Sequence, residues 1–386
     1  MSRIPEMRFD GFTEPWEQRK VGDVTKELSE YDNLASGLPL LTSSRNGLMY
    51  QSDYRGNVTT ENENTLFSVV PVNACTYRHM SDDSTFHLNT NTLEKGLVSR
   101  EYPVFQGDGS NLKFIVQYIN SSNSFTKFCA EQKKGGTRTR LYYKTLCEYT
   151  LMIPSIKEQN KIAGFFESLD HLITLHQRKY DRLKNLKKAY LEKMFPKNGE
   201  TVPEIRFDGF TEPWEQRKVS ELFRVTRGYV LAATQTETTK TDEKPYPVYS
   251  SQTKDKGLMG YYKDYLYEDA ITWTTDGANA GTVNYRAGKF YCTNVCGVLL
   301  SNEVKANQMI AEALNSVAKG YVSYVGNPKL MNNVMADIVI QIPAQAEERE
   351  QLSSFFDKLD NLIILHQHRL ERLKNLKQSY LQKMFA

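Results

Sequence analysis

The sequence repeats itself, and this repeat constrains the fold more than any other feature of the chain. Residues 5–21 read PEMRFDGFTEPWEQRKV and residues 203–219 read PEIRFDGFTEPWEQRKV, so that only Met7 and Ile205 differ. Self-similarity over so long a segment indicates that one structural plan is used twice. A chain of 386 residues has room for two such copies, each with a core of its own.

A second pair of segments repeats at a constant offset of 190 residues. Residues 175–195 (LHQRKYDRLKNLKKAYLEKMF) and 365–385 (LHQHRLERLKNLKQSYLQKMF) match at 14 of 21 positions, and an FFxxLD box precedes each. The bodies between the repeated segments, 22–152 and 220–341, differ strongly. They keep only short echoes, such as a Ser-Ser pair followed by Gly-Leu-Met in each body. The repeated arm and helix segments, which we call the frame, are therefore duplicated, whereas the two bodies between them differ.

Residues 156–195 and 345–385 are predicted to be helices, because apolar residues recur there at spacings of three and four. Each helix would be about 60 Å long at 1.5 Å per residue. Neither can bury its apolar stripe alone, so we expect the two copies to pair antiparallel. The expected seam consists of Leu169, Leu172, His176, Leu183, Leu186, Tyr190, Leu359, Leu362, His366, Leu373, Leu376 and Tyr380. We interpret the two histidines as polar residues that fix the register rather than as metal ligands.

The bodies are predicted to mix strands, helices and loops. Runs of β-branched and aromatic residues, separated by Gly, Asn, Ser and Asp, predict strands at 66–72, 113–119, 149–153, 270–274, 295–300 and 336–342. The expected fold class is therefore α+β. Two mixed α/β domains are joined by two long helices that form an antiparallel coiled coil, with an internal pseudo-two-fold repeat.

Composition excludes few functions by itself. The 49 basic and 46 acidic residues give a net charge of +3, which is too balanced to identify a nucleic-acid partner. The five cysteines are irregularly spaced and form no CxxC pair, so we interpret them as free thiols rather than zinc ligands. The N-terminus has no apolar signal segment, and no run is long enough to span a membrane. We therefore expect a cytoplasmic protein without a membrane partner.

The sequence contains no catalytic motif on which an activity could rest. GxxxxGK[ST], GxGxxG, HExxH and GxSxG are all absent. We accordingly predict no catalytic residue and no metal site. The sequence therefore favours a function in binding rather than in catalysis.

Polar and basic residues that suit DNA gather in two places in each body. Arg can grip guanine, and Asn or Gln can grip adenine, through paired hydrogen bonds, although an ordinary polar loop has the same composition. Cations around the Gly-Gly turn of residues 131–140 could meet phosphates, and residues 319–329 occupy the corresponding place in the second body. The predicted DNA-binding residues are Ser43, Ser44, Arg45, Asn46, Lys133, Lys134, Arg138, Arg140, Ser250, Ser251, Gln252, Lys254, Tyr324, Asn327 and Lys329.

The helix segment 178–193 is also rich in Lys and Arg. A solvated outer face, a contact with a partner protein and a contact with passing DNA all remain open for it.

The RFDGFTEPWEQRKV arms, the unlike bodies and the FFxxLD…LHQ…RLKNLK…YLxKMF helices together resemble the specificity subunits of type I restriction–modification enzymes over the whole chain. By this resemblance the chain divides into a repeat arm (1–21), a first target-recognition domain (22–152), a central helix (153–198), a second arm (199–219), a second target-recognition domain (220–341) and a distal helix (342–386).

The resemblance implies a non-catalytic subunit that reads a bipartite, asymmetric site on double-stranded DNA. Each target-recognition domain would read one half, and the paired helices would act as a ruler between them. Two modification (methyltransferase) subunits and two restriction (ATP-dependent translocase and nuclease) subunits would be the partners. This chain would bind no cofactor, while S-adenosylmethionine, ATP and Mg²⁺ would belong to the partners. The alternative is a coiled-coil adaptor that joins two protein-binding domains and never touches DNA.

Overall fold

The computed structural model of the chain describes residues 5–55, 64–133, 135, 137–197, 199–251 and 254–385. The chain forms two compact units. Unit 1 contains residues 1–176 and 369–386, and unit 2 contains residues 177–368. Each unit thus combines an arm, a body and segments of both long helices, α5 (Ile156–Lys193) and α9 (Ala346–Phe385).

The two repeat arms form equivalent strands. β1 (Glu17–Lys20) pairs antiparallel with β13 (Thr150–Ile153) in unit 1, and β14 (Glu215–Lys218) pairs antiparallel with β21 (Val339–Ile342) in unit 2. In each unit the long helix that begins a few residues later is thereby attached to the arm.

A buried ion pair reinforces this attachment in both units. Arg8 donates from Nε and Nη2 to the two carboxylate oxygens of Glu158 at 2.6 and 2.7 Å. Arg206 binds Glu348 in the same way, at 2.7 and 2.8 Å. Both glutamates lie in the first turn of their helix and are only 1% exposed. Bidentate geometry makes such a pair both strong and directional.

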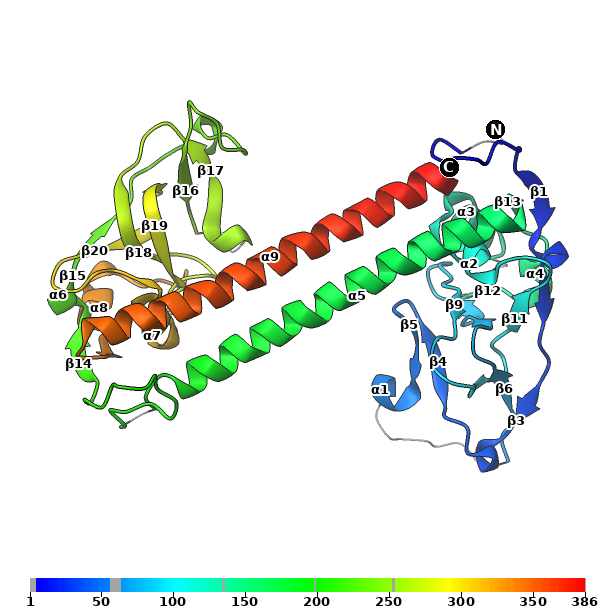
Figure 1. The fold of residues 1–386 in the computed structure, drawn as a ribbon, viewed down its shortest axis with the longest axis horizontal. Coiled ribbons are helices and arrows are strands. Elements are labelled where there is room, and N and C mark those ends of the chain that lie inside the picture. The colour runs from blue at the N-terminus through cyan, green and yellow to red at the C-terminus, as the bar shows by residue number, and fades with distance from the viewer. Residues whose placement is uncertain are drawn as a thin grey trace. The chain divides into compact units, whose positions relative to one another are not determined.

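The long helices run antiparallel within each unit. In unit 1, Asp170 accepts from Lys377 at 2.6 Å, and five residues before Asp170 the Phe165 ring meets the Tyr380 ring at 5.0 Å. In unit 2, Lys187 donates to Asp360 at 2.6 Å and Tyr190 contacts Phe355 at 4.9 Å. Residue numbers thus rise along one helix as they fall along the other, as the duplicated sequence predicts (Figure 1).

Lys187 belongs to the basic segment 178–193, for which the sequence allows several interpretations. Its ammonium is mostly buried and donates to both Glu312 and Asp360. At least this residue of the segment therefore serves an internal ion-pair network rather than the solvent.

The two units build their sheets differently. Unit 1 has several small sheets, with strand orders β10-β6-β3 and β2-β11-β7-β9 in the larger two. Its other elements are β2 (Thr25–Glu27), β3 (Tyr31–Asp32), β4 (Leu41–Ser44), β5 (Gly47–Tyr50), α1 (Gln51–Arg55), β6 (Phe67–Val70), β7 (Cys75–Thr76), β8 (Met80–Ser81), β9 (Asn89–Thr90), β10 (Gly96–Ser99), β11 (Val104–Gly107), α2 (Leu112–Ser121), α3 (Asn123–Glu131), β12 (Thr139–Arg140) and α4 (Tyr143–Leu146).

Unit 2 is organised around a six-stranded sheet of order β15-β20-β18-β19-β16-β17, against which α7 packs on the β19 side. Its other elements are α6 (Val219–Leu222), β15 (Phe223–Arg227), β16 (Tyr246–Tyr249), β17 (Leu258–Tyr262), β18 (Tyr267–Thr274), β19 (Val283–Cys292), β20 (Cys296–Ser301), α7 (Gln308–Val317) and α8 (Asn332–Asp337).

The fold class predicted from the sequence is confirmed, but one predicted strand is wrong. Residues 113–119 form most of α2, not a strand. The side chain of Asn111 accepts from the backbone N–H of Phe114 and caps the helix. Polar residues at 113, 117 and 120 recur at helical spacing, and this periodicity overrides the β-branched composition. The predicted strand at 336–342 also begins inside α8 and becomes β21 only at Val339.

The predicted seam residues differ in burial. Leu169, Leu359 and His366 are buried, and His176, Leu183, Tyr190, Leu373 and Tyr380 are half-buried. Leu172, Leu186, Leu362 and Leu376 remain 39–42% exposed. The heptad pattern therefore overstates how much of the stripe is covered. The buried seam leucines Leu169 and Leu359 belong to the hydrophobic cores of the two units.

The buried arm–helix ion pair gives a stability prediction. Arg206→Met leaves Glu348 buried without its partner, which should cost about 3–5 kcal/mol of unfolding free energy. Urea unfolding followed by circular dichroism measures this loss as a lower midpoint. The combined variant Arg206→Met with Glu348→Gln should recover part of it, because the buried charge is gone.

The matched control is Lys218→Met, which breaks an exposed ion pair with Asp337 in the same unit. An exposed pair contributes about 0–1 kcal/mol. If Arg206→Met and Lys218→Met shift the midpoint equally, the buried pair does not hold the arm.

Candidate nucleic-acid interface

The Ser-Ser and Gly-Leu-Met segments that recur in both bodies lie on a β-hairpin in each unit. β4 and β5 pair antiparallel in unit 1, with Ser44 opposite Gly47. β16 and β17 pair antiparallel in unit 2, and Ser250 donates its N–H to the carbonyl of Gly257 at 2.9 Å. The predicted base-reading residues that the structure describes therefore lie at or beside the ends of two equivalent hairpins.

Local hydrogen bonds shape the tip of the first hairpin. The Ser44 hydroxyl accepts from the backbone N–H of Asn46 and donates to the carbonyl of Gly47, both at 3.1 Å. Gly47 has a φ of +118°, which a residue with a side chain rarely adopts. Arg45 and Asn46 are left exposed at the end of the hairpin. A two-stranded ribbon of this kind fits the major groove of DNA.

Ser43 does not share this exposure, although the sequence places it in the same predicted set. Its side chain is buried and its hydroxyl accepts from the amide of Asn89 at 2.7 Å. Side chains alternate along a strand, so the residue next to an outward Ser44 points into the unit. Ser43 therefore supports the hairpin and cannot meet a base edge as placed.

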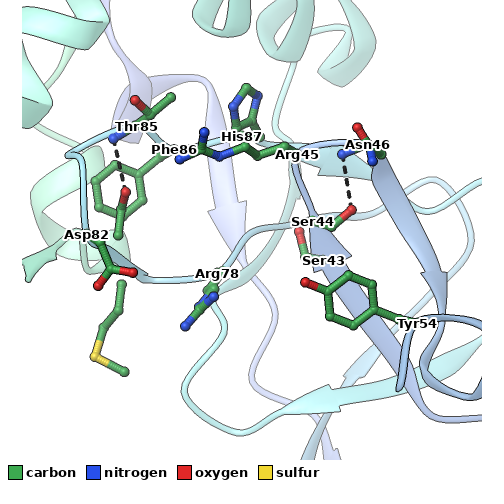
Figure 2. Close-up of a pocket in the computed structure, with 12 residues that line it drawn as sticks. Ser43, Ser44, Arg45, Asn46, Tyr54, Arg78, Asp82, Thr85, Phe86 and His87 are labelled. Atoms are coloured by element: carbon green, nitrogen blue, oxygen red, sulfur yellow. Dashed lines mark hydrogen bonds between the residues drawn. The ribbon is translucent and has the colours of Figure 1, made fainter. Parts of the chain in front are cut away.

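A pocket of about 360 Å³ opens beside this hairpin tip. Figure 2 shows that its wall combines the tip with the segment that follows β7. The lining residues are Ser43, Ser44, Arg45, Asn46, Tyr54, Arg78, Met80, Ser81, Asp82, Thr85, Phe86 and His87.

The basic segment of the first body reaches the same pocket. β12 pairs antiparallel with β8, so that Arg140 lies opposite Met80. Arg138 donates from Nε to Asp82 at 2.8 Å, and Asp82 lines the pocket. Two predicted patches that are about 90 residues apart in the sequence are thus brought together.

The charges around the pocket are only partly compensated. Arg45 pairs with Asp83, and Arg138 with Asp82. The Ser81 hydroxyl, the Thr85 N–H and Arg45 hold the pKa of Asp83 well below its usual range, so this carboxylate stays ionised. Arg78 and Arg140 are exposed, and neither forms an ion pair with a residue that the structure describes. Among these described residues, positive charge therefore exceeds negative charge.

The second unit brings its two predicted segments together through the turn after β18. Asn279 donates from Nδ2 to the carbonyl of Ser251 at 3.0 Å, and Gly277 donates its N–H to the carbonyl of Pro328 at 2.9 Å. Lys329 lies 3.7 Å from Asp276. Residues 250–251 and 323–329 are consequently neighbours of one turn.

Residues 323–329 form a narrow loop. Ser323 and Lys329 exchange two backbone hydrogen bonds, of 2.8 and 2.9 Å. Tyr324 is 70% exposed and Asn327 is also exposed, so their side chains are available to a partner.

Some predicted site residues fall outside what the structure describes. Lys134 and Gln252 lie outside the described residues, and only the backbone of Lys254 is described. Lys133 is exposed at the end of α3.

Sequence reasoning did not select Arg78, Asp82, Asp83 or His87. The sequence signal for Arg78, Asp82 and Asp83 is a charged segment, RHMSDD, between two runs of strand-forming residues, and His87 follows this segment. It could not be ranked above other polar loops, because the pairing of β8 with β12 that places it is a long-range contact.

Nothing in the described part of the chain suggests a metal centre or a reactive thiol. No group of three or more His, Cys, Asp or Glu residues is arranged to hold a metal ion there. All five cysteines are free, and burial raises the pKa of the Cys296 thiol to about 11. Among the described helices, none is long and apolar enough to cross a membrane.

Comparison with known proteins assigns the family. Residues 87–185 and 211–375 match the sequence profile of the family described as the type I restriction modification DNA specificity domain. The two matches together cover more than half of the chain, and the chain belongs to this family.

The relatives agree with this assignment. A protein from Mycoplasma pneumoniae described as a type I specificity subunit is 36% identical over 143 residues, which cover 36% of this chain and 74% of the relative. A second such protein from the same organism is 30% identical over 231 residues, covering 58% of this chain and 81% of the relative. The crystal structure of the type I restriction–modification S subunit from M. genitalium has a TM-score of 0.73 and 13% identity, covering 99% of both chains. At this identity the likeness shows a shared fold.

The electrostatics of the first pocket can be tested through His87. Burial lowers the pKa of His87 below its ordinary value, and the neighbouring Arg45 lowers it further, while Asp83 raises it. Arg45→Gln should therefore raise the pKa of His87, and Asp83→Asn should lower it. Both shifts can be measured by NMR titration of the labelled imidazole. Shifts of the same sign in both variants would contradict the placement of these charges.

Proposed function

We propose that this chain is the DNA-reading subunit of a type I restriction–modification enzyme and that each unit reads one half of a bipartite, asymmetric site. The observation that carries the proposal is the convergence, in each unit, of a polar hairpin tip with a second predicted DNA-contact segment. The family assignment makes DNA the partner that this surface would meet.

The chemistry of the first unit suits a division of roles. Arg45 and Asn46 stand at the end of a ribbon, where paired hydrogen bonds to guanine or adenine are geometrically accessible. Arg78, Arg138 and Arg140 surround the pocket and would contact phosphates, which position the protein without reading sequence. Asp82 and Asp83 hold two of the arginines in place before DNA arrives.

The same division applies to the second unit, with different residues. Gln252 and the segment around it would read bases, and Lys329, Asn327 and Tyr324 would contact the neighbouring backbone. Because the two units use unlike side chains on equivalent hairpins, their half-sites would differ. The site would therefore be asymmetric.

The frame would bind the partner subunits and set the distance between the two half-sites. Two modification subunits would dock on the two copies of the frame, and two restriction subunits would complete the nuclease. S-adenosylmethionine, ATP and Mg²⁺ would be bound by those partners, and this chain would contribute binding alone. The paired helices would fix the gap between the half-sites. We expect the assembly in the cytoplasm.

A coiled-coil adaptor without DNA contact is the alternative function. Exposed Tyr324 and the other polar loops could also bind a protein. The concentration of uncompensated arginines around the first pocket favours DNA, because a phosphate backbone offers the matching charge.

Removing the basic segment tests the phosphate contacts. Arg138→Ala with Arg140→Ala should weaken DNA binding by the assembled methyltransferase and lower the slope of log K against log salt concentration by about two. Fluorescence anisotropy over a salt series measures both. The control is Lys26→Ala with Lys95→Ala, which removes two exposed charges of unit 1 outside the pocket lining. If the two double variants have equal salt slopes, Arg138 and Arg140 do not contact DNA phosphates.

Exchanging one body tests modular reading. Residues 22–152 can be replaced by the equivalent body of another family member, with the arms and helices left intact. Methylome sequencing of a host that carries the chimera and its modification subunit should show one half-site changed and the other retained. If both halves change, or neither does, the units do not read independently.

A further inference from the structure

A second pocket, of about 160 Å³, lies in unit 2 and is lined mainly by β18, β19 and the connection between β16 and β17. Its volume is far above the roughly 10–15 Å³ that one water molecule needs. Hydroxyls, amides and two cations dominate the lining, and none of the lining residues is acidic. They are Ser250, Lys256, Thr272, Trp273, Thr274, Asn279, Thr282, Asn284, Arg286 and Cys296.

Arg286 is the unusual member of this lining, because it is only 5% exposed. Its Nε donates to the Thr272 hydroxyl at 3.0 Å, and its Nη2 donates to the carbonyl of Lys256 at 2.7 Å. The guanidinium lies over the Tyr249 ring at 3.7 Å. Among the residues described in unit 2, no carboxylate lies within ion-pair distance of it. Burial lowers the pKa of Arg286, but a guanidinium remains charged at neutral pH.

The second cation of the lining, Lys256, has a counter-ion. The ammonium of Lys256 binds Asp360 at 3.0 Å, and Asp360 also accepts from Lys187 and Gln308. The charge of Lys256 is therefore compensated on the side of the long helices. Arg286 is the cation that the pocket leaves without a counter-ion, and a buried charge without a partner is costly.

The rest of the lining offers hydrogen-bond donors around this charge. The hydroxyls of Thr274 and Thr282 and the amide of Asn284 form no side-chain hydrogen bond with another described residue. Hydroxyl and amide groups can all donate to an anionic oxygen. Together with a guanidinium they form the kind of donor set that binds phosphate.

We propose that the pocket around Arg286 is a binding subsite for a phosphate-type oxyanion, with Thr274, Thr282 and Asn284 as its neutral donors. Ser250, which follows β16 in the hairpin of unit 2, also lines the pocket. The oxyanion is therefore a backbone phosphate of DNA held beside that hairpin, an assignment that rests on the function proposed above. Free inorganic phosphate has the same chemistry and is the other source.

A purely structural Arg286, which only ties β18 and β19 to the Lys256 carbonyl, makes a different prediction. Asn284→Asp distinguishes the two, because it is nearly isosteric and places a carboxylate in the pocket. A structural arginine would gain a counter-ion and lose nothing. A phosphate site would lose its ligand, since the new carboxylate both repels the anion and occupies the guanidinium.

The first measurement is calorimetric titration of the full chain with inorganic phosphate. We expect saturable binding to the wild type that weakens by about tenfold or more in Asn284→Asp. Asn302→Asp adds the same charge at an exposed position of unit 2 and should bind phosphate like the wild type. Urea unfolding should show no loss of stability in Asn284→Asp. Phosphate binding that is absent from the wild type, or unchanged in Asn284→Asp, would overturn the proposal.

The second measurement identifies the source of the anion. If it is a DNA phosphate, Asn284→Asp lowers the salt slope of DNA binding by the assembled methyltransferase by about one. A lost phosphate affinity with an unchanged DNA slope would keep the subsite and assign it to free phosphate. The calorimetric result does not depend on DNA, so it stands even if the wild-type complex fails to bind DNA at all.

Discussion

Each unit completes its hydrophobic core with a helix segment from the other repeat, and the remainder of the structure depends on this exchange. The end of α9 places Tyr380 and Phe385 against Phe165 and Phe166 in unit 1. In unit 2, Tyr190 near the end of α5 packs against Phe355, and Phe195 just after the helix packs against Phe356. Because the buried faces must match in both places, the helices have to remain alike even where the bodies differ.

The ion pairs follow the same exchange. Asp170 binds Lys377 in unit 1, and Asp360 binds Lys187 in unit 2, so each aspartate of one helix copy is satisfied by a lysine of the other. An aspartate and a lysine that are 17 residues apart in the same helix cannot reach each other. The pairing is thus possible only between the two helices, and it fixes their register together with the aromatic contacts.

The sequence was sufficient to predict the frame but not the interiors of the bodies. Repeats and heptad spacing are local patterns, and they located both helices within three residues of their observed ends and predicted their antiparallel pairing. The strand predicted at 113–119 is wrong, because the helical spacing of its polar residues and the cap at Asn111 override its β-branched and aromatic composition.

The candidate interface shows the same limit. The hairpin tips were found because Ser-Ser and Gly-Leu-Met recur in both bodies. The sequence does not single out Asp82, His87 or Arg286, because pairings between distant strands, β8 with β12 and β16 with β19, shape the pockets that they line. Ser43 illustrates the converse, since this residue of a predicted base-reading segment is buried and supports the hairpin from within.

One backbone contact carries a consequence for how such a chain can be rearranged. In unit 2, Ile205 donates its N–H to the carbonyl of Lys193 at 2.8 Å, across a short connecting segment of the same chain. In unit 1, the equivalent contact of 3.0 Å joins Met7 to Lys383, from opposite ends of the sequence. The junction between a helix end and an arm is therefore equivalent in the two units, and the chain crosses it directly only in unit 2. A gene that broke the chain between Lys193 and Ile205, and joined it between Lys383 and Met7, would encode the same set of contacts in a different order.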